Sequence, residues 1–403
     1  MSPDHVLTFT EQVNAPAKQV YRAFTNSTAL REWLCDEASA VARAGGRIYL
    51  WWNDGYYSSG EYQILEPEEE IRFTWRAKDD PAASLVKVRL SKRDEGTLIE
   101  LEHSALESGD ERQETIAEMQ KAWESSLKNL VSVLETGEDL RFVNRPMLGI
   151  TLDDFNDEVA EKLGVPVKEG IRIDGVVDGM GAQAAGLQAD DVLVGLAGQE
   201  VSDWPTLTNA LQRLQAGDEI DVTLYRGSEK RTVKMTLSRR PLPEIPETPA
   251  ALAQVVEKKY ERMEAALDDF FAEVSEEQAS RKPVQDIWSP KETLAHLIHG
   301  ERGWHTWMAD LVGGFEPSYD DWGGNLQARI DATITAYPTI AELREELRRN
   351  CAETVAFLAR LPEEFVARKG SYWRLGHNMV EQPYHFNQHL DQMRSAVESA
   401  LQR

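Results

Sequence analysis

A proline-rich stretch at residues 240–246 divides the chain into parts that differ in pattern. Its prolines fix φ and favour an extended spacer, so the residues beyond it are expected to fold around a core of their own. Those residues are helical in pattern throughout, whereas the residues before them form short runs separated by glycine. The joint near residues 135–146 is less marked. The sequence predicts a multidomain α+β protein with domains at 1–140, 142–240 and 248–403.

The net charge of −25 limits the classes of partner. It argues against a general role on nucleic acid or on an anionic membrane, because such binding begins with a basic surface. The two cysteines, Cys35 and Cys351, form neither a disulfide framework nor a zinc-knuckle spacing, and they suit a reducing compartment. The N-terminus lacks a leader pattern and no apolar run reaches spanning length, so a cytoplasmic protein is expected.

The first segment combines strand-like runs with one long helix. Alternation and β-branched or aromatic content predict four strands at residues 6–9, 48–52, 71–75 and 98–102. From Glu114 to Leu134 the apolar residues recur at helical spacing. A curved antiparallel sheet closed by a C-terminal helix follows from this order.

The first segment resembles the SRPBCC superfamily, in the branch related to activators of the Hsp90 ATPase. The motifs that carry the resemblance are Ala15-Pro16 with residues 20–24, then residues 30–34, 45–48 and 60–62, and Trp123 with Leu127 and Leu130. The resemblance implies a helix-grip fold with an interior pocket, and a small apolar ligand or a chaperone as partner. Trp33, Trp75 and Trp123 are the candidate pocket residues, although filling of the core is the favoured role of each tryptophan. His103 is expected to be solvated or at a strand edge.

The second segment alternates short strands with glycine turns. Strand-like runs occur at residues 148–150, 169–177 and 220–227, and a helix is expected from about Pro205 to Leu214. Between them lies the run from Ala182 to Leu193, AQAAGLQADDVL, followed by the GQEV of residues 198–201.

These motifs closely resemble a PDZ domain of the bacterial, HtrA-like kind, a β-sandwich-like fold. The resemblance implies a loop whose N–H groups hold the terminal carboxylate of a peptide, which adds a strand beside Ile150. A role as spacer or in intramolecular docking is the alternative. Asp191 stands where the family usually has glycine, which is tolerable if φ stays negative or if the aspartate adopts the left-handed conformation. The implied loop is Met147, Leu148, Gly149 and Ile150, and the implied groove wall is Thr206, Leu207, Ala210 and Leu214.

The third segment has the periodicity of an all-α four-helix bundle. Helices are expected at residues 249–274, 290–312, 339–361 and about 376–401. Ser289, Pro290 and Glu292 form a capping-box signature at the start of the second helix. His296 falls on the apolar face of that helix, whereas His299 and His305 fall outside its stripe.

Three histidines of this segment are candidate metal ligands. His385 and His389 are one helical turn apart, so both side chains can reach one ion, and His296 faces them from another helix. Neutral imidazole suits zinc, nickel or iron, with zinc the default by ligand type, and three ligands leave a position for water or substrate. Taken singly, each histidine is more easily explained as structural. Glu301, Glu381 and Asp391 are possible outer-shell groups, and a solvated carboxylate is the simpler role for each.

The third segment also resembles the DinB superfamily, which includes YfiT-like and thiol-dependent transferase proteins. The carrying residues are Trp288-Ser289-Pro290 with residues 294–297, and residues 384–389 with Gln392-Met393. The resemblance implies that His296, His385 and His389 bind the metal, and that some members transfer groups with a low-molecular-weight thiol. In such chemistry the ion stabilises the thiolate.

Two functions remain open on the sequence alone. One is a metal-dependent thiol transferase or hydrolase, with the other two domains supplying ligand and peptide binding. The other is a non-enzymatic adaptor or stress-related scaffold that binds a C-terminal peptide and an apolar ligand or chaperone. The open coordination position favours the enzyme, whereas the lack of a specific general base favours the adaptor. No residue is assigned a catalytic role.

Overall fold

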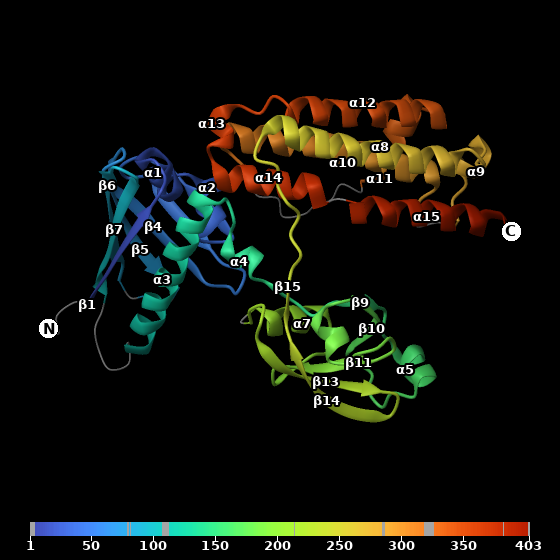
Figure 1. The fold of residues 1–403 in the computed structure, drawn as a ribbon, viewed down its shortest axis with the longest axis horizontal. Helices are drawn as coiled ribbons and strands as arrows, with labels where there is room; N and C mark the ends of the chain where they lie inside the picture. The colour runs from blue at the N-terminus through green and yellow to red at the C-terminus, as the bar shows by residue number, and fades with distance from the viewer. Residues whose placement is uncertain are drawn as a thin grey trace. The chain divides into compact units, whose positions relative to one another are not determined.

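The computed structural model describes residues 5–78, 80, 82–106, 113–212, 214–283, 287–317, 326–381 and 383–401. The side chains of residues 381, 383–385, 400 and 401 lie outside that description. The chain forms two compact units. One joins residues 1–139 with residues 243–403, and the other is residues 140–242. We call residues 1–139 the first module, residues 140–242 the second module and residues 243–403 the helical module (Figure 1).

The first module is a seven-stranded antiparallel sheet with a long helix, α3 (Gln113–Glu135), packed on it (Figure 1). The sheet order is β1-β7-β6-β5-β4-β3-β2. All four predicted strands and the long helix are confirmed, and α1 (Ala17–Thr25) and α2 (Ser27–Trp33) are additional. The strands are β1 (His5–Val13), β2 (Glu37–Ala40), β3 (Arg47–Trp51), β4 (Tyr57–Glu66), β5 (Glu70–Ala77), β6 (Ser84–Arg93) and β7 (Gly96–Leu106).

The core of the first module lies between the sheet and α3. Trp123, Leu127 and Leu130 project from α3 at the predicted helical spacing and are buried. Each fully buried leucine contributes about 2 kcal/mol of hydrophobic stabilisation. Buried polar ends of aromatic residues are also satisfied, because the Trp33 indole N–H donates to the Ala23 carbonyl and the Tyr62 hydroxyl donates to the Phe24 carbonyl.

The expectation that His103 is solvated or at a strand edge is wrong. His103 is 0% exposed and lies on β7, which is an interior strand of the sheet. The Trp123 indole N–H donates to His103 Nδ1 at 3.0 Å, so Nδ1 is the unprotonated nitrogen. His103 Nε2 therefore carries the proton and donates to Ser84 Oγ at 2.7 Å. Burial lowers the pKa of His103 to about 4.

The second module contains a six-stranded antiparallel sheet, a separate two-stranded sheet formed by β8 and β15, and short helices. Its main path is β14-β13-β11-β10-β9, so β9 lies at an edge, and β12 pairs with β11. The strands are β8 (Pro146–Met147), β9 (Ile150–Asp153), β10 (Ile171–Val176), β11 (Val192–Leu196), β12 (Gln199–Glu200), β13 (Glu219–Arg226), β14 (Glu229–Thr236) and β15 (Ser238–Arg239). The helices are α4 (Leu140–Val143), α5 (Asp157–Leu163), α6 (Gly181–Ala184) and α7 (Trp204–Leu211).

Asp191 has a structural role in this module that the sequence did not reveal. The left-handed residue of the turn is Asp190, with φ of 69°, and not Asp191. Asp191 is 0% exposed and accepts two hydrogen bonds from the Arg226 guanidinium, at 2.7 and 2.8 Å. Its carboxylate also accepts from the backbone N–H of Gln188. The condition that φ stay negative at Asp191 is thus met, and the side chain ties the turn to β13.

The helical module contains the four predicted long helices and shorter ones between them. The last predicted helix is divided: residues up to 381 belong to α14, and α15 begins at Pro383, as proline at a first helical position favours. His299, predicted to fall outside the apolar stripe, is buried, because α11 covers it and supplies the Arg329 carbonyl and the Thr333 hydroxyl as partners. The helices are α8 (Pro249–Phe271), α9 (Glu276–Ser280), α10 (Pro290–Gly313), α11 (Gln327–Ala336), α12 (Ile340–Leu358), α13 (Glu363–Val366), α14 (Lys369–Glu381) and α15 (Pro383–Leu401).

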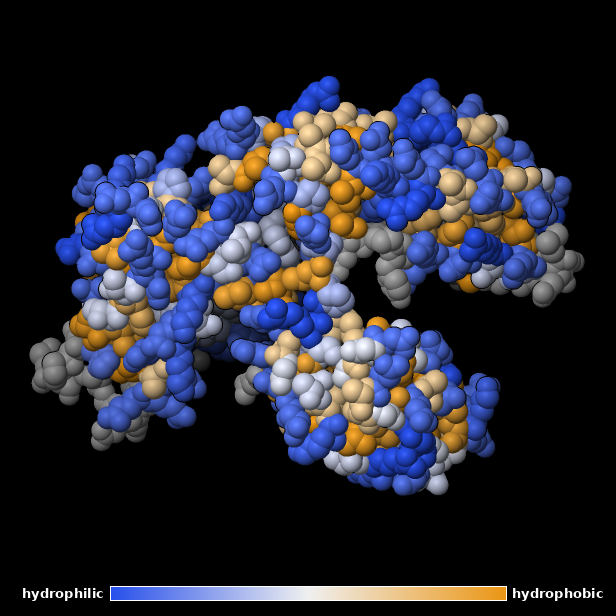
Figure 2. Space-filling view, in the orientation of Figure 1, coloured by the Kyte–Doolittle hydropathy of each residue, from blue (hydrophilic) through white to orange (hydrophobic). Residues whose placement is uncertain are grey.

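Hydrophilic side chains cover most of the surface visible in Figure 2. In the part of the chain that the structure describes, no helix combines the length and the apolar character needed to cross a membrane.

Candidate functional site

Two imidazole rings from different helices meet in the helical module. His296 on α10 and His389 on α15 have ring centroids 4.7 Å apart, with 63° between the ring planes. With zinc–nitrogen bonds of about 2.1 Å, two imidazole ring centres bound to one ion lie roughly 5 Å apart. An edge-to-face contact between two rings without a metal gives centroid distances in the same range. The centroid distance alone therefore does not distinguish a metal site from a ring contact.

A hydrogen bond on His389 favours the metal-binding interpretation. Gln392 Oε1 lies 3.1 Å from His389 Nδ1. Because an amide oxygen only accepts hydrogen bonds, Nδ1 carries the proton and Nε2 keeps its lone pair. Metal-binding histidines usually donate their other N–H to such an oxygen. Gln392 follows His389 by three residues, a helical spacing that would have identified it from the sequence.

The start of α10 holds His296 in place. The predicted capping box is present: Ser289 Oγ accepts from the Glu292 N–H, and Glu292 Oε2 accepts from the Ser289 N–H. Trp288, directly before the helix, lies against the His296 ring with centroids 4.9 Å apart. The capping box fixes the start of α10, and Trp288 packs against the His296 ring. Such support is what a preorganised site needs.

An open hollow of about 630 Å³ adjoins His389. Its volume lies within the range of small-molecule sites. Apolar side chains from the segment before α10 form one part of the lining, and amide and hydroxyl groups of α15 form another. The lining residues are Pro283, Ile287, Trp288, His389, Gln392, Ser395, Ala396 and Ser399.

The third predicted ligand, His385, has its backbone in α15, but its side chain lies outside the described residues. Among the described side chains, no three or more of His, Cys, Asp and Glu come together in a group that would hold a metal ion. The structure thus brings together two of the three expected ligands, and the full site stays a prediction.

The three candidate outer-shell carboxylates differ in their surroundings. Glu301 is not a solvated group, because its Oε2 accepts from the Tyr260 hydroxyl at 2.8 Å and from the Thr354 hydroxyl at 2.9 Å. Burial raises the pKa of Glu301. Asp391 is solvent-exposed and pairs with Arg394 at 3.0 Å, and the Glu381 side chain lies outside the described residues.

Glu301 belongs to a polar network that joins three helices. His305 Nε2 lies 2.9 Å from Thr354 Oγ1, so α8, α10 and α12 are linked through Tyr260, Glu301, Thr354 and His305. Burial lowers the pKa of the neighbouring Lys259 to about 8, and the Lys259 ammonium donates to the Met379 carbonyl. Within the described residues, these hydrogen bonds make the network a polar link among the three helices.

The predicted carboxylate-binding loop of the second module has a suitable backbone. The Leu148 carbonyl accepts from the Ala182 N–H, and the Gly149 carbonyl accepts from the Val177 N–H. Because C=O and N–H point in opposite directions across a trans peptide, the N–H groups of Gly149 and Ile150 point away from those partners. Gly149 has φ of 76°, and an added Cβ would lie 2.3 Å from that of Met180, so glycine is required there.

The predicted groove wall is mostly part of the core of the second module. Leu207 is 2% exposed and Ala210 is 1% exposed. The Thr206 hydroxyl completes a capping box with Asp203 at the start of α7. Leu214 is partly buried against the same core. The edge strand β9 remains the part of the predicted groove that offers unpaired strand geometry.

The three candidate pocket tryptophans of the first module pack in its core. Trp33, Trp75 and Trp123 are all buried, and the rings of Trp75 and Trp123 are 5.6 Å apart. Trp75 also contacts the His103 ring at 5.8 Å. These contacts agree with the favoured role of filling the core.

Three family models match the chain, each over a different part. The model for activator of Hsp90 ATPase homolog 1-like protein matches residues 14–135. The PDZ domain model matches residues 146–237, and the DinB superfamily model matches residues 259–393. These matches confirm the three resemblances and the α+β architecture drawn from the sequence.

The curated relatives are similar over a small part of their length. A probable periplasmic serine endoprotease, DegP-like, of Marinomonas sp. is 30% identical over 99 residues, which are 25% of this chain and 21% of that protein. A probable periplasmic serine protease, do/HhoA-like, of Haemophilus influenzae is 32% identical over 110 residues, 27% of this chain and 23% of that protein. The chain therefore spans about a quarter or less of the length of these proteins.

Solved structures resemble about a third of the chain. The Aha1 dimer from Colwellia psychrerythraea is 20% identical, with 33% of this chain and 98% of that chain covered at a TM-score of 0.30. CalU16 from Micromonospora echinospora is 27% identical, with 32% and 74% covered at a TM-score of 0.28.

Proposed function

We propose that this chain, which joins an Hsp90-ATPase-activator-like module, a PDZ module and a DinB-like helical module, is a metal-dependent enzyme acting on a small thiol-linked or organic substrate. The observation that carries the proposal is the approach of His296 and His389, with the Gln392 amide oxygen fixing the tautomer of His389. His385, one turn before His389, is the proposed third ligand. Zinc is proposed first, with nickel or iron as alternatives, on the chemistry of imidazole alone.

The chain's own residues would bind and position the substrate. The hollow beside His389 offers Ile287 and Trp288 to an apolar group, and the hydroxyls of Ser395 and Ser399 to a polar one. A bound divalent cation would stabilise a thiolate at neutral pH and polarise the bond to be broken. A low-molecular-weight thiol fits the size of the hollow.

Metal analysis of the full-length wild-type protein tests the proposal. We expect about one divalent ion per chain, and a loss of most of it in His296→Ala and in His389→Ala. His5→Ala, which removes an exposed histidine of β1, should keep the wild-type content. Unchanged metal content in His296→Ala would disprove the site. In the cobalt-substituted protein, glutathione should add a thiolate-to-metal absorption band.

A second function, that of an adaptor, is supported by the PDZ module. Its edge strand β9 and the outward N–H groups of Gly149 and Ile150 suit an added peptide strand that ends in a carboxylate. The packed tryptophans of the first module favour a chaperone at its surface over a ligand enclosed among them. Stoichiometric metal without any response to thiols, together with peptide binding, would favour the adaptor over the enzyme.

We also propose a cytoplasmic location. Cys35 and Cys351 are both buried thiols, which suits a reducing compartment. The curated relatives are named as periplasmic, so fractionation of cells that express the native chain is the direct test.

A further inference from the structure

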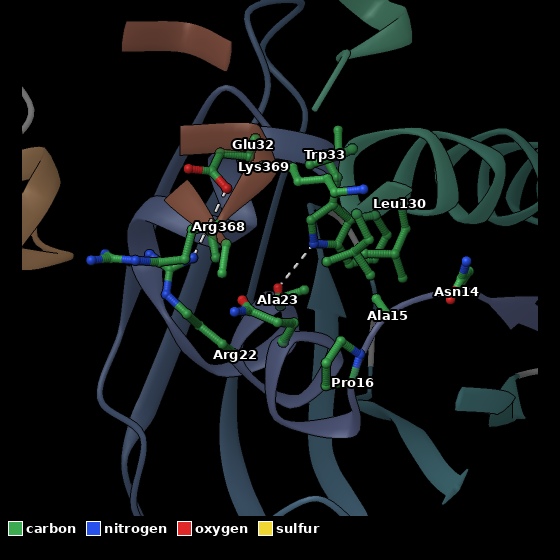
Figure 3. Close-up of a pocket in the computed structure, with 16 residues that line it drawn as sticks. Asn14, Ala15, Pro16, Arg22, Ala23, Glu32, Trp33, Leu130, Arg368 and Lys369 are labelled. Atoms are coloured by element: carbon green, nitrogen blue, oxygen red, sulfur yellow. Dashed lines mark hydrogen bonds and ion pairs between the residues drawn. The ribbon is translucent and has the colours of Figure 1, made fainter. Parts of the chain in front are cut away.

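A small cavity lies where the first module meets the helical module within their common compact unit (Figure 3). It holds about 70 Å³. One water needs roughly 10–15 Å³ by this measure, so the cavity has room for several waters or for one small polyatomic ion. Residues from α1, α2 and α3 line it on one side, and residues 367–370 at the start of α14 line it on the other.

The charges around the cavity are unbalanced. Arg22, Arg368 and Lys369 line it together with a single carboxylate, that of Glu32. In Figure 3, Arg22, Arg368 and Glu32 lie together on one side of the cavity, whereas Leu130 and Ala15 lie on the other. The protein as a whole carries a net charge of −25, so this local excess of positive charge is unusual.

The single carboxylate neutralises the arginines poorly. Glu32 Oε2 is 4.0 Å from Arg22 Nη1, which is longer than a charge-assisted hydrogen bond, and Glu32 Oε1 accepts from the Ser371 hydroxyl. Arg368 donates to the Val312 carbonyl at the end of α10. Arg22 Nη2 is buried and has no hydrogen-bond partner among the described residues. A buried guanidinium nitrogen without an acceptor is costly, so the positive charge of Arg22 is incompletely compensated by the described protein groups.

The helices add to the positive potential. Both α1 and α14 begin at the cavity, α1 has no side-chain cap at Pro16, and neither helix carries an acidic residue in its first turn. Helix N-termini carry partial positive charge, so their effect has the same sign as that of the arginines. Burial lowers the pKa of Arg22, and the nearby Arg368 lowers it further while Glu32 opposes this, which agrees with two cations facing each other.

We propose that this cavity binds a small oxyanion, such as inorganic phosphate or a short carboxylate, held between Arg22 of the first module and Arg368 of the helical module. The bound anion would bridge the two modules and stabilise their contact. The site is separate from the histidine site and does not depend on the proposed function.

Isothermal titration calorimetry on the full-length protein tests the proposal, with inorganic phosphate, sulfate and acetate as probes at constant ionic strength. We expect saturable binding of at least one probe, weakened roughly tenfold or more in Arg22→Gln. Tighter binding of phosphate and sulfate would assign a tetrahedral anion, and tighter binding of acetate would assign a carboxylate. Arg360→Gln, which changes an exposed arginine of the helical module, should bind as the wild type does.

A second variant keeps the binding test valid if Arg22→Gln does not fold. Ala367→Leu keeps every charge and adds bulk at an exposed residue of the cavity lining, so it should also abolish binding. Circular dichroism establishes that each variant is folded. The proposal is overturned if no probe binds saturably, or if folded Arg22→Gln and Ala367→Leu both bind phosphate and acetate as tightly as the wild type.

Discussion

The imidazole of His103 shows how one residue couples the core of the first module to pH. Its two nitrogens are engaged by Trp123 and Ser84, and the arrangement suits only the neutral ring. Protonation of Nδ1 would oppose the Trp123 N–H and place a charge in an aromatic core. The hydrogen bonds and the burial therefore act together on the same protonation state.

Acid should destabilise the first module through His103. Burial lowers its pKa from an ordinary 6.5 to about 4, so the unfolded chain takes up a proton below pH 6.5 that the folded chain refuses until about pH 4. Stability is then full above pH 6.5 and falls as the pH drops from 6.5 to 4, by up to about 3 kcal/mol. Urea unfolding at pH 7 and pH 4.5 measures this loss.

His103→Gln is the matched control for that measurement. A glutamine amide offers an acceptor to Trp123 and a donor to Ser84 but does not titrate in this range. The variant should therefore lose less stability than the wild type between pH 7 and pH 4.5. Equal losses in both proteins would show that other groups cause the pH dependence.

At the scale of elements, the sequence predicted the long, strongly periodic ones and missed those fixed by tertiary contacts. The helix over residues 114–134 and the capping box at Ser289 are local patterns, and both are confirmed. Helix α11 has a weak periodicity of its own and packs over His299, so its position depends on a contact that no local pattern encodes. The same reason explains why the half-buried Glu301 was expected to be solvated.

The candidate site was predictable in part. The spacing of His385 and His389 is local, but the approach of His296 to His389 depends on how α10 packs on α15. Gln392 was within reach of sequence analysis by its helical spacing. The cavity beside Arg22 was not, because its walls come from segments more than 300 residues apart.

Gly370→Ala should weaken the packing of α14 on the first module. An added Cβ would lie 2.7 Å from Val133 Cγ1 and 2.9 Å from Glu32 Oε2, so α14 would have to shift. We expect a loss of about 1–3 kcal/mol, the usual cost of overpacking. Thermal unfolding of the full-length protein measures it.

Gly300→Ala is the control for Gly370→Ala. It lies inside α10, where an added Cβ meets no other atom within 4 Å. Alanine favours a helix over glycine by about 1 kcal/mol, so this variant should be as stable as the wild type or more stable. A Gly370→Ala protein as stable as the Gly300→Ala protein would contradict the close packing of α14.

At the scale of the whole molecule, the first and helical modules share one compact unit although the second module separates them in sequence. Glu316 is central to their contact. Its carboxylate accepts from the Trp307 indole at 2.7 Å and pairs with Arg374 of the helical module at 2.8 Å and with Arg31 of the first module at 3.5 Å. Its backbone N–H donates to Thr28 Oγ1. We therefore expect the two modules to unfold together in calorimetry, and the second module to unfold in a transition of its own.

Glu316→Gln should lower the shared transition and leave that of the second module unchanged. The variant removes the charge that two partly buried arginines face, at a cost of about 1.5–3 kcal/mol, the range for hydrogen bonds to charged groups. Burial raises the pKa of Glu316, but Arg374, the Trp307 hydrogen bond and Arg31 together bring it below the ordinary 4.5. This contribution of Glu316 to stability is thus present above pH 4.5 and is lost as the pH falls through the lowered pKa.

Glu364→Gln is the control for Glu316→Gln. It breaks the exposed pair with Lys18 across the same contact and should cost under about 0.5 kcal/mol. Separate transitions for the first and helical modules in the wild type, or equal effects of the two variants, would show that the modules are joined by the chain alone.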